Sequence, residues 1–170
     1  MSESKNEPRN GRRRPRATSP RATSTTSPRA ASTTSPRAAA RKPTARAARA
    51  AAADEARKLA LIVASAALEK KALAVEILDV VGKVDYADFL VLMTGRSNRQ
   101  VDALAQAIEE ECAKKKVRPL SVEGKTSAAW VLIDFGDVVV HIFQDEARGL
   151  YDIEGLWLDA KRLPVPGQTP

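Results

Sequence analysis

Large apolar side chains are almost absent from the first 52 residues, so only the remaining 118 residues can form a folded core. This segment consists mainly of Arg, Ala, Ser, Thr and Pro, and Met1 is its one large apolar residue. Such a composition buries too little apolar surface to offset the entropy lost on ordering the chain. The sequence therefore predicts a disordered tail over residues 1–52, a folded domain over residues 53–163 and a flexible end over residues 164–170.

Charge divides the chain at the same place. The tail holds 13 Lys and Arg against 2 Glu, whereas residues 53–170 hold 15 Lys and Arg against 19 Asp and Glu. The net charge of +7 is therefore the sum of a tail of +11 and a body of −4. Three interpretations of the tail remain open: an arm that binds RNA phosphates, a solubilising segment without a partner, or an organelle transit peptide.

Several classes of protein are excluded or disfavoured by composition. Cys112 is the only cysteine, so neither an internal disulfide nor a multi-cysteine metal cluster can form. The longest apolar run, Ala60–Leu68, is shorter than the roughly 20 residues of a membrane helix. No apolar segment follows the first basic residues, so no secretory signal peptide is expected. We expect a cytoplasmic protein, or one of an organelle stroma or matrix if the tail is a transit peptide.

Hydrophobic periodicity predicts a single α/β domain with a mixed β-sheet flanked by helices. The continuous apolar run Phe89–Met93 is typical of a central strand covered on both faces. Ser97 and Gln100 have the spacing of a helix-capping box. The expected order is helix, strand, strand, helix, strand, hairpin and one or two short helical turns, over residues 54–71, 74–81, 88–94, 97–115, 119–123, 130–143 and 145–158.

Residues 130–143 indicate a β-hairpin with Gly136 at the first central position of a type II′ turn. A two-residue turn determines which residues of the two strands face the same side of the sheet. One side is entirely apolar and is expected to join the core: Val131, Ile133, Phe135, Val138, Val140 and Ile142. The other side mixes large apolar and polar groups: Trp130, Leu132, Asp134, Val139, His141 and Phe143. Such a mixed face is either covered by a helix or offered to a partner.

Residues suited to catalysis are few. His141 is the only histidine and lies within a predicted strand, where a packed or hydrogen-bonded role is expected. Cys112 lies on the apolar stripe of a predicted helix, as an inert buried thiol would. Neither has a neighbour in sequence that would complete a nucleophile and base pair. No catalytic residue, cofactor or metal is therefore expected.

One segment supports an alternative, a nucleotidyltransferase-like enzyme that binds nucleotides. In Thr94–Ser97 a strand passes through glycine into a helix N-terminus, an arrangement that can present backbone amides to phosphate. Metal ligands would have to come from acidic residues such as the pairs Asp85 with Asp88 and Asp134 with Asp137. Residues three apart in a strand point to opposite faces, so neither pair can hold one ion if both members lie in the strand. Tight packing and a helix cap explain the glycine and serine equally well.

Three ordered motifs resemble a known family. Tyr86–Val101 resembles D-x-F-V-I-x-(S/T)-G-x-S-x-R-Q-V, and Val122–Gly124 followed by Trp130–His141 resembles V-E-G…W-x-x-x-D-x-G-D-V-x-V-H. Arg148–Trp157 resembles R-x-x-Y-x-L-E-x-L-W. These motifs are similar to those of the ribosomal silencing factors of the Iojap family. The resemblance covers about 100 residues and does not include the tail.

The resemblance implies a nucleotidyltransferase-like fold that works without transferase chemistry. Members of the family bind a protein of the large ribosomal subunit at the surface that faces the small subunit. They thereby block subunit joining and lower translation when nutrients are short, and several form homodimers. The chain departs from the family at Gly149 and Gly155, and a glycine within a helical turn costs about 1 kcal/mol relative to alanine. A looser C-terminal element is therefore expected.

Trp130 is the expected anchor of a partner-binding surface, because tryptophan is enriched among residues that dominate binding energy. Leu132 shares its face, and Glu123, Asp134 and His141 are expected to surround the indole and pair with basic ribosomal side chains. The alternatives are burial of Trp130 under a helix and solvated or turn-capping roles for the others. A third functional class, a nucleic-acid packaging accessory acting mainly through the basic tail, also stays open.

Overall fold

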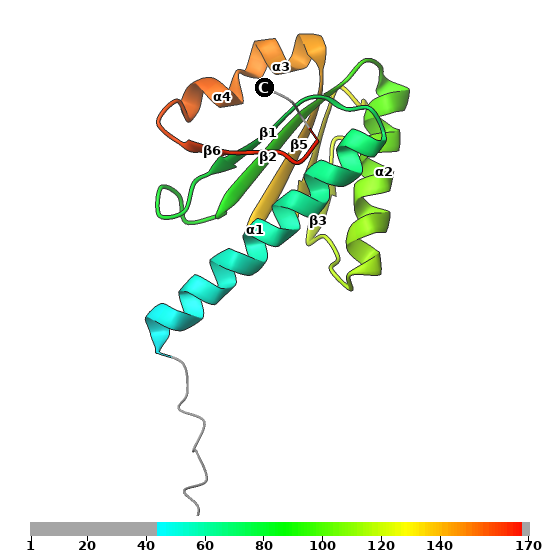
Figure 1. Ribbon diagram of the computed structural model, residues 1–170. Helices are drawn as coiled ribbons and strands as arrows, with labels where there is room; N and C mark the ends of the chain where they lie inside the picture. Colours follow the sequence, from blue (N-terminus) through cyan, green and yellow to red (C-terminus); the bar gives the residue numbers. More distant parts are fainter. Residues whose placement is uncertain (1–43, 168–170) are drawn as a thin grey trace, which may run out of the picture. The chain divides into compact units, whose positions relative to one another are not determined.

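The computed structural model describes residues 44–167, which form one α/β domain with a mixed sheet, as the sequence predicts (Figure 1). Residues 1–43, with most of the expected tail, and residues 168–170 lie outside the described range. Every helix within that range is too short or too polar to span a bilayer. The elements in chain order are α1 (Ala45–Glu69), β1 (Leu73–Asp79), β2 (Phe89–Gly95), α2 (Asn98–Lys114), β3 (Ser121–Glu123), β4 (Trp130–Asp134), β5 (Val138–Gln144), α3 (Asp145–Tyr151), α4 (Ile153–Leu156) and β6 (Lys161–Leu163).

The sheet has six strands in the order β3-β4-β5-β2-β1-β6. β2 and β5 pair in parallel at the centre, and the other neighbours are antiparallel. Every residue of β2 is buried, as expected of a central strand. The main core lies between one face of the sheet and helices α1 and α2, and a smaller core lies on the opposite face under α3 and α4.

Helix α1 begins at Ala45, nine residues before the expected start at Asp54. The Thr44 hydroxyl caps the helix by accepting a hydrogen bond from the amide of Ala47 at 3.3 Å. The intervening residues are alanine and arginine, which have high intrinsic helix propensity and need no buried face to remain helical. The expected boundary of the tail at residue 52 was therefore wrong, because residues 45–52 belong to α1.

A short strand at the C-terminal end was missed. β6 pairs antiparallel with the free edge of β1, where Ile77 lies opposite Leu163. β6 has only three residues, and two of them are basic, so its sequence shows no alternation that would indicate a strand. The strand forms because the edge of β1 is free to pair with it. Val165 packs against the main core, so the folded part also extends past the expected boundary at residue 163.

The start of α2 confirms the predicted cap. The Ser97 hydroxyl accepts a hydrogen bond from the amide of Gln100 at 3.3 Å. In a standard capping box the Gln100 side chain would accept a hydrogen bond from the Ser97 amide. Here it accepts one from the Arg96 amide instead, at 2.8 Å. Its amide nitrogen donates to the carbonyls of Lys70 and Lys71 at 3.2 and 3.0 Å. Gln100 therefore joins the beginning of α2 to the end of α1.

The hairpin has the predicted turn and register. The Phe135 amide donates to the Val138 carbonyl at 2.9 Å, and Gly136 between them has φ of +89°. Trp130 lies opposite Phe143. Five of the six residues of the expected core face are fully buried in the main core and the sixth is partly buried: Val131, Ile133, Val138, Val140, Ile142 and Phe135.

The backbone at Gly124, which follows β3, lies very close to the backbone of β4 at Trp130. Its φ is +83°, and a Cβ atom there would overlap the Trp130 carbonyl oxygen. We expect Gly124→Ala to lower the free energy of unfolding by more than about 2 kcal/mol, measured by urea denaturation. The matched control is Gly149→Ala in α3, where a Cβ meets no atom within 4 Å and helix propensity predicts a gain of about 0.5–1 kcal/mol. Equal stability of the two variants would contradict this close approach.

Candidate functional site

Four rings form an aromatic cluster on the mixed face of the hairpin. Trp130 stacks on Phe143 at 5.3 Å and on His141 at 5.8 Å between ring centroids. Tyr151 of α3 also packs against Trp130, with 4.5 Å between the ring centroids. Trp130 is half-buried, whereas Phe143 is fully buried. The indole is therefore held rigidly by its neighbours while part of it remains accessible.

His141 of β5 lies on the strand next to Trp130 and is more deeply buried than the indole. Its side chain is buried, and its Nδ1 atom accepts a hydrogen bond from the indole Nε1 of Trp130 at 3.3 Å. Burial lowers the pKa of His141 to about 4, although nearby Glu154 opposes the change. At neutral pH the ring is therefore uncharged and orients the indole. The sequence suggested a charged histidine at the edge of the surface, but the side chain is buried and packs against Trp130 and Phe143.

The other three predicted site residues separate into two groups. Glu123, Trp130 and Leu132 line one depression of about 170 Å³ together with Gly124, and Glu123 is exposed there. Asp134 lies at the far end of β4, and its carboxylate accepts a hydrogen bond from the Gly136 amide at 2.6 Å. Asp134 therefore has the turn-capping role, because its position next to the hairpin turn satisfies that amide. We call Glu123, Trp130, Leu132 and Tyr151 the Trp130 surface.

Tyr151 is the member of this surface that sequence reasoning missed. Helix α3 has seven residues, too few for periodicity to show which side faces the sheet. The tyrosine within the third motif was the one available signal. Further exposed apolar residues lie on the same C-terminal segment: Leu150, Leu156 and Leu158.

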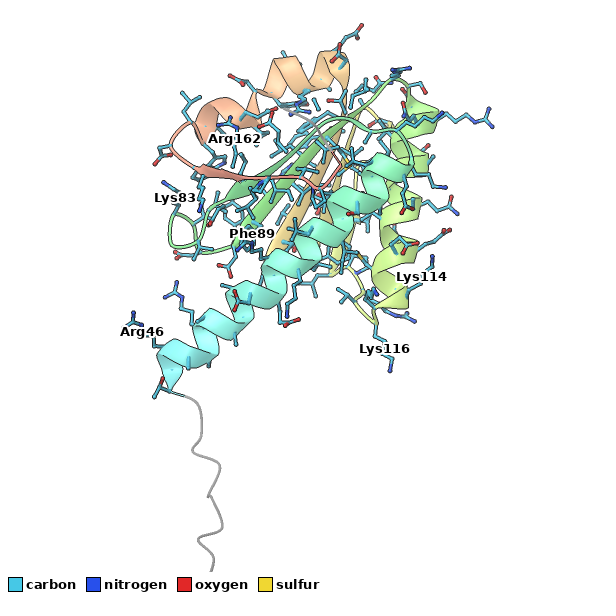
Figure 2. All side chains as sticks on the ribbon, in the orientation of Figure 1. Arg46, Lys83, Phe89, Lys114, Lys116 and Arg162 are labelled. Carbon is cyan, nitrogen blue, oxygen red and sulfur yellow. The ribbon has the colours of Figure 1, made fainter. Side chains whose placement is uncertain are left out.

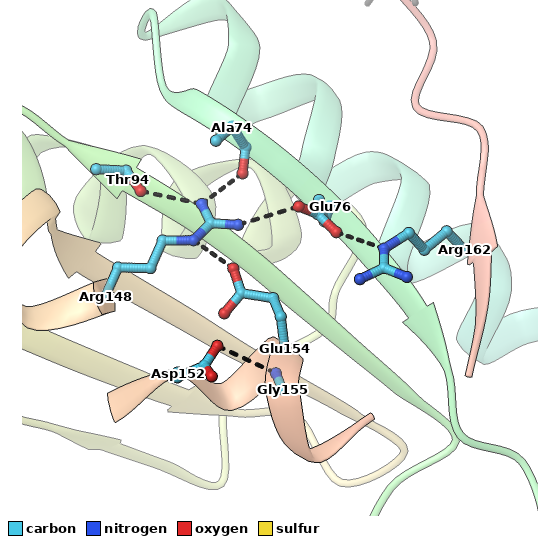
Figure 3. Close-up of polar contacts among 8 residues, drawn as sticks. All are labelled: Ala74, Glu76, Thr94, Arg148, Asp152, Glu154, Gly155 and Arg162. Atoms are coloured by element: carbon cyan, nitrogen blue, oxygen red, sulfur yellow. Dashed lines mark hydrogen bonds and ion pairs between the residues drawn. The ribbon is translucent and has the colours of Figure 1, made fainter. Parts of the chain in front are cut away.

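A polar network centred on Arg148 fixes α3 and α4 on the sheet (Figure 3). The guanidinium donates to the Ala74 carbonyl at 2.6 Å and to the Thr94 hydroxyl at 3.0 Å. It also pairs with Glu154 at 2.5 Å and with Glu76 at 3.4 Å. The side chain of Arg148 is only 11% exposed, so these contacts are shielded from water. One arginine therefore connects α3, α4, β1 and β2.

The network compensates for weak apolar attachment, since neither α3 nor α4 contains a fully buried residue. Ala74 lies at an irregularity in the pairing of β1 with β2 and has φ of +44°, and its carbonyl is the one that Arg148 binds. Glu76 also pairs with Arg162 of β6 at 2.8 Å. The position of Tyr151 beside Trp130 thus depends mainly on polar contacts made by its own helix.

Gly155 takes part in a helix cap, a role that helix propensity alone did not indicate. Asp152 has a left-handed conformation between α3 and α4, and its side chain accepts a hydrogen bond from the Gly155 amide at 3.2 Å. A Cβ atom at position 155 would overlap the Asp152 carboxylate. A larger residue at this position would therefore require the Asp152 side chain to move and would disturb this cap.

The turn from β2 into α2 is closed by its own contacts. A Cβ atom at Gly95 would lie 2.9 Å from the Val101 side chain, so tight packing explains the glycine. The Arg96 amide, which a phosphate would need, already donates to Gln100. No three His, Cys, Asp or Glu side chains within residues 44–167 converge as metal ligands.

Comparison with known proteins identifies the family. Residues 53–170 match the family described as ribosomal silencing factor during starvation. The chain belongs to this family. Family membership confirms the resemblance that the three motifs indicated, and the match begins within α1.

Family members from bacteria and from a plant are similar to this chain over different shares of their own length. The chain is 38% identical over 99 residues to ribosomal silencing factor RsfS of Bacillus subtilis, covering 58% of this chain and 84% of the relative. It is 34% identical over 110 residues to a protein named Iojap, chloroplastic, of Zea mays, covering 65% of this chain and 48% of the relative.

Solved structures share the fold. A protein of Chromobacterium violaceum superposes with a TM-score of 0.57 at 36% identity, covering 69% of this chain and 88% of that one. A protein of Bacillus halodurans has a TM-score of 0.58 at 33% identity, covering 64% of this chain and 99% of that one.

Burial of neutral His141 makes stability dependent on pH. The pKa is about 4 in the folded protein and about 6.5 when unfolded, so the unfolded state binds the extra proton between these values. Stability is therefore fully present above pH 6.5 and is lost as the pH falls toward 4. We expect the free energy of unfolding to fall by about 2 kcal/mol more between pH 7 and pH 5 than in His141→Gln, measured by urea titration. Identical pH profiles would contradict a buried neutral imidazole.

The Arg148 network gives a second expectation. Arg148→Met leaves Glu154 and the Ala74 carbonyl without their shared partner, so we expect a loss of about 3–5 kcal/mol in the free energy of unfolding. The control is Arg162→Gln, whose side chain is 46% exposed and whose loss should cost less than about 1 kcal/mol. Urea denaturation followed by tryptophan fluorescence measures both. Similar costs for the two variants would mean that apolar contacts hold α3.

Proposed function

We propose that this chain binds the large ribosomal subunit through the Trp130 surface and represses translation by keeping the subunits apart. The observation that carries the proposal is the partly buried indole of Trp130, held by Phe143, His141 and Tyr151. Large aromatic anchors of this kind dominate the energy of many interfaces. Relatives in bacteria are named ribosomal silencing factors, which supports the ribosome as the partner.

Charge supports a basic ribosomal protein at the subunit interface as the direct contact. The folded part has a net charge of −4, and exposed Glu123 lies beside Trp130 in the same depression. An apolar anchor next to a carboxylate suits a partner that offers an apolar contact near Lys or Arg. Asp134 and His141 are not part of this contact, because one caps a turn and the other is buried.

In this proposal the domain represses translation by its volume alone and catalyses no reaction. A standard interface buries roughly 800 Å² on each partner, and a domain seated there would occupy space needed by the small subunit. The competing nucleotide-binding enzyme would have to use the turn at Gly95, where packing against Val101 and the Gln100 side chain already fills the position. Calorimetric titration with nucleotides and Mg²⁺ distinguishes the two, since a clear heat of binding would favour the enzyme.

Three further features of the proposal follow from the family and the sequence. The basic tail contacts RNA non-specifically, because its arginines release counterions from phosphates. The chain acts wherever its ribosomes are, in a bacterial cytoplasm or in an organelle, since relatives include both bacterial and chloroplastic proteins. A homodimer is compatible with the resemblance.

A packaging accessory that acts only through its tail would lose all ribosome binding when residues 1–43 are removed.

Trp130→Ala tests the proposed anchor. We expect this change to weaken binding to isolated large subunits at least about tenfold, because the partner loses its central apolar contact. The control is Tyr86→Ala, which removes another exposed aromatic ring, on the segment between β1 and β2. Co-sedimentation with purified large subunits measures the affinity, and circular dichroism checks the fold.

The same variants test the mechanism. The unmodified chain and Tyr86→Ala should slow the joining of purified subunits in a light-scattering assay, whereas Trp130→Ala should not at the same concentration. Joining at the normal rate with saturating unmodified chain would overturn the steric mechanism. Unchanged affinity of Trp130→Ala would remove the Trp130 surface from the proposal.

A further inference from the structure

The first three turns of α1 contribute nothing to either core. The first buried residue of the helix is Ala56, and in residues 45–55 only Ala53 is even partly buried. Figure 1 shows this end of α1, in cyan, continuing away from the sheet. The family match begins at residue 53, so most of this stretch lies outside the shared domain. Burial raises the pKa of Asp88 and the charge of Arg49 opposes this change, but burial of apolar surface does not account for this stretch of the helix.

Arginines form one face of this stretch. Arg46, Arg49 and Arg57 are exposed, and at 3.6 residues per turn they lie within about 80° of one another around the axis. None of the three makes an ion pair within residues 44–167, whereas Lys58 pairs with Glu55 at 2.6 Å. Figure 2 shows Arg46 near the free end of the helix. We call these three residues the arginine face of α1.

The chemistry of this face suits an RNA backbone better than a protein surface. Between the arginines lie alanines and two acidic residues, Asp54 and Glu55, so no large apolar side chain is present to anchor a protein partner. Guanidinium groups bind phosphate through two parallel hydrogen bonds without reading sequence. The preceding residues 1–43 add 11 Lys and Arg against 2 Glu, so the face continues a long basic segment.

Charge balance points in the same direction. The body of net charge −4 would be repelled by the phosphates of a ribosome, and this cost grows as the body approaches. We propose that the arginine face of α1 binds the phosphate backbone of ribosomal RNA while the Trp130 surface binds its protein partner. This inference rests on the proposed function, and it adds a second, electrostatic contact to it.

The test compares two triple variants, one that removes three positive charges from the arginine face and one that removes three elsewhere on the domain. The variant is Arg46→Gln with Arg49→Gln and Arg57→Gln in the full chain, because glutamine retains helix propensity. The control replaces three exposed basic residues away from the start of α1: Lys70→Gln, Arg118→Gln and Lys161→Gln. Affinity for isolated large subunits is measured over a series of salt concentrations. Circular dichroism verifies that both variants keep their helices.

We expect the plot of log affinity against log salt to be shallower by about 2 for the arginine variant, since each lost phosphate contact removes roughly 0.7–0.9 from the slope. The control should keep a slope within about 0.5 of the unmodified chain. Equal slopes for the two triple variants would overturn the inference.

A second arm separates this inference from the proposed function by using protein-free RNA of the large subunit as the probe. The arginine variant should bind this RNA more weakly than the control variant, and Trp130→Ala should bind it as the unmodified chain does. If the arginine variant binds the RNA as tightly as the control, the arginine face is not an RNA contact. If Trp130→Ala also binds intact subunits normally, the proposed function fails while the arginine result still stands.

Discussion

The parallel pairing of β2 with β5 places the two most buried strands at the centre of the sheet and requires cover on both faces. Two long helices cover one face completely enough for Ala60, Val63 and Ile108 to be fully buried. The other face has only the short helices α3 and α4, which extend over β2 and β5 and leave β4 partly open. Trp130 lies where this cover ends, so the accessible indole is a consequence of the topology.

The incomplete cover also explains why a polar network holds the short helices. Apolar burial cannot fix elements that lack a fully buried residue, so Arg148 fixes them through carbonyl, hydroxyl and carboxylate contacts. A buried ionic network adds little net stability but is costly to break, which favours one geometry over its alternatives. That geometry places Tyr151 against Trp130. A surface preorganised in this way loses little side-chain entropy when a partner binds.

Sequence reasoning succeeded where structure is determined locally. The glycine of the Gly136 turn and the alternation on either side predicted the register of the hairpin, and Ser97 predicted the start of α2. It failed where contacts join distant residues. Arg148 and Ala74 are 74 positions apart, and no pattern at either position indicates the other. His141 and Trp130 were placed on the same face, but the sequence does not indicate which of them is buried and which stays partly exposed.

The start of α1 shows a different limit, because there the failure came from equating the absence of a core with the absence of structure. Alanine and arginine favour a helix without any buried face, so the basic residues next to the domain are displayed on a rigid support. In the proposed arrangement one rigid body carries both contacts, so docking of Trp130 would hold the arginines near RNA at a high effective concentration. Electrostatic attraction of this kind speeds association and weakens with salt, whereas the apolar anchor limits dissociation. Under the two proposals the acidic body would supply specificity at Trp130, and the basic helix would supply long-range attraction at α1.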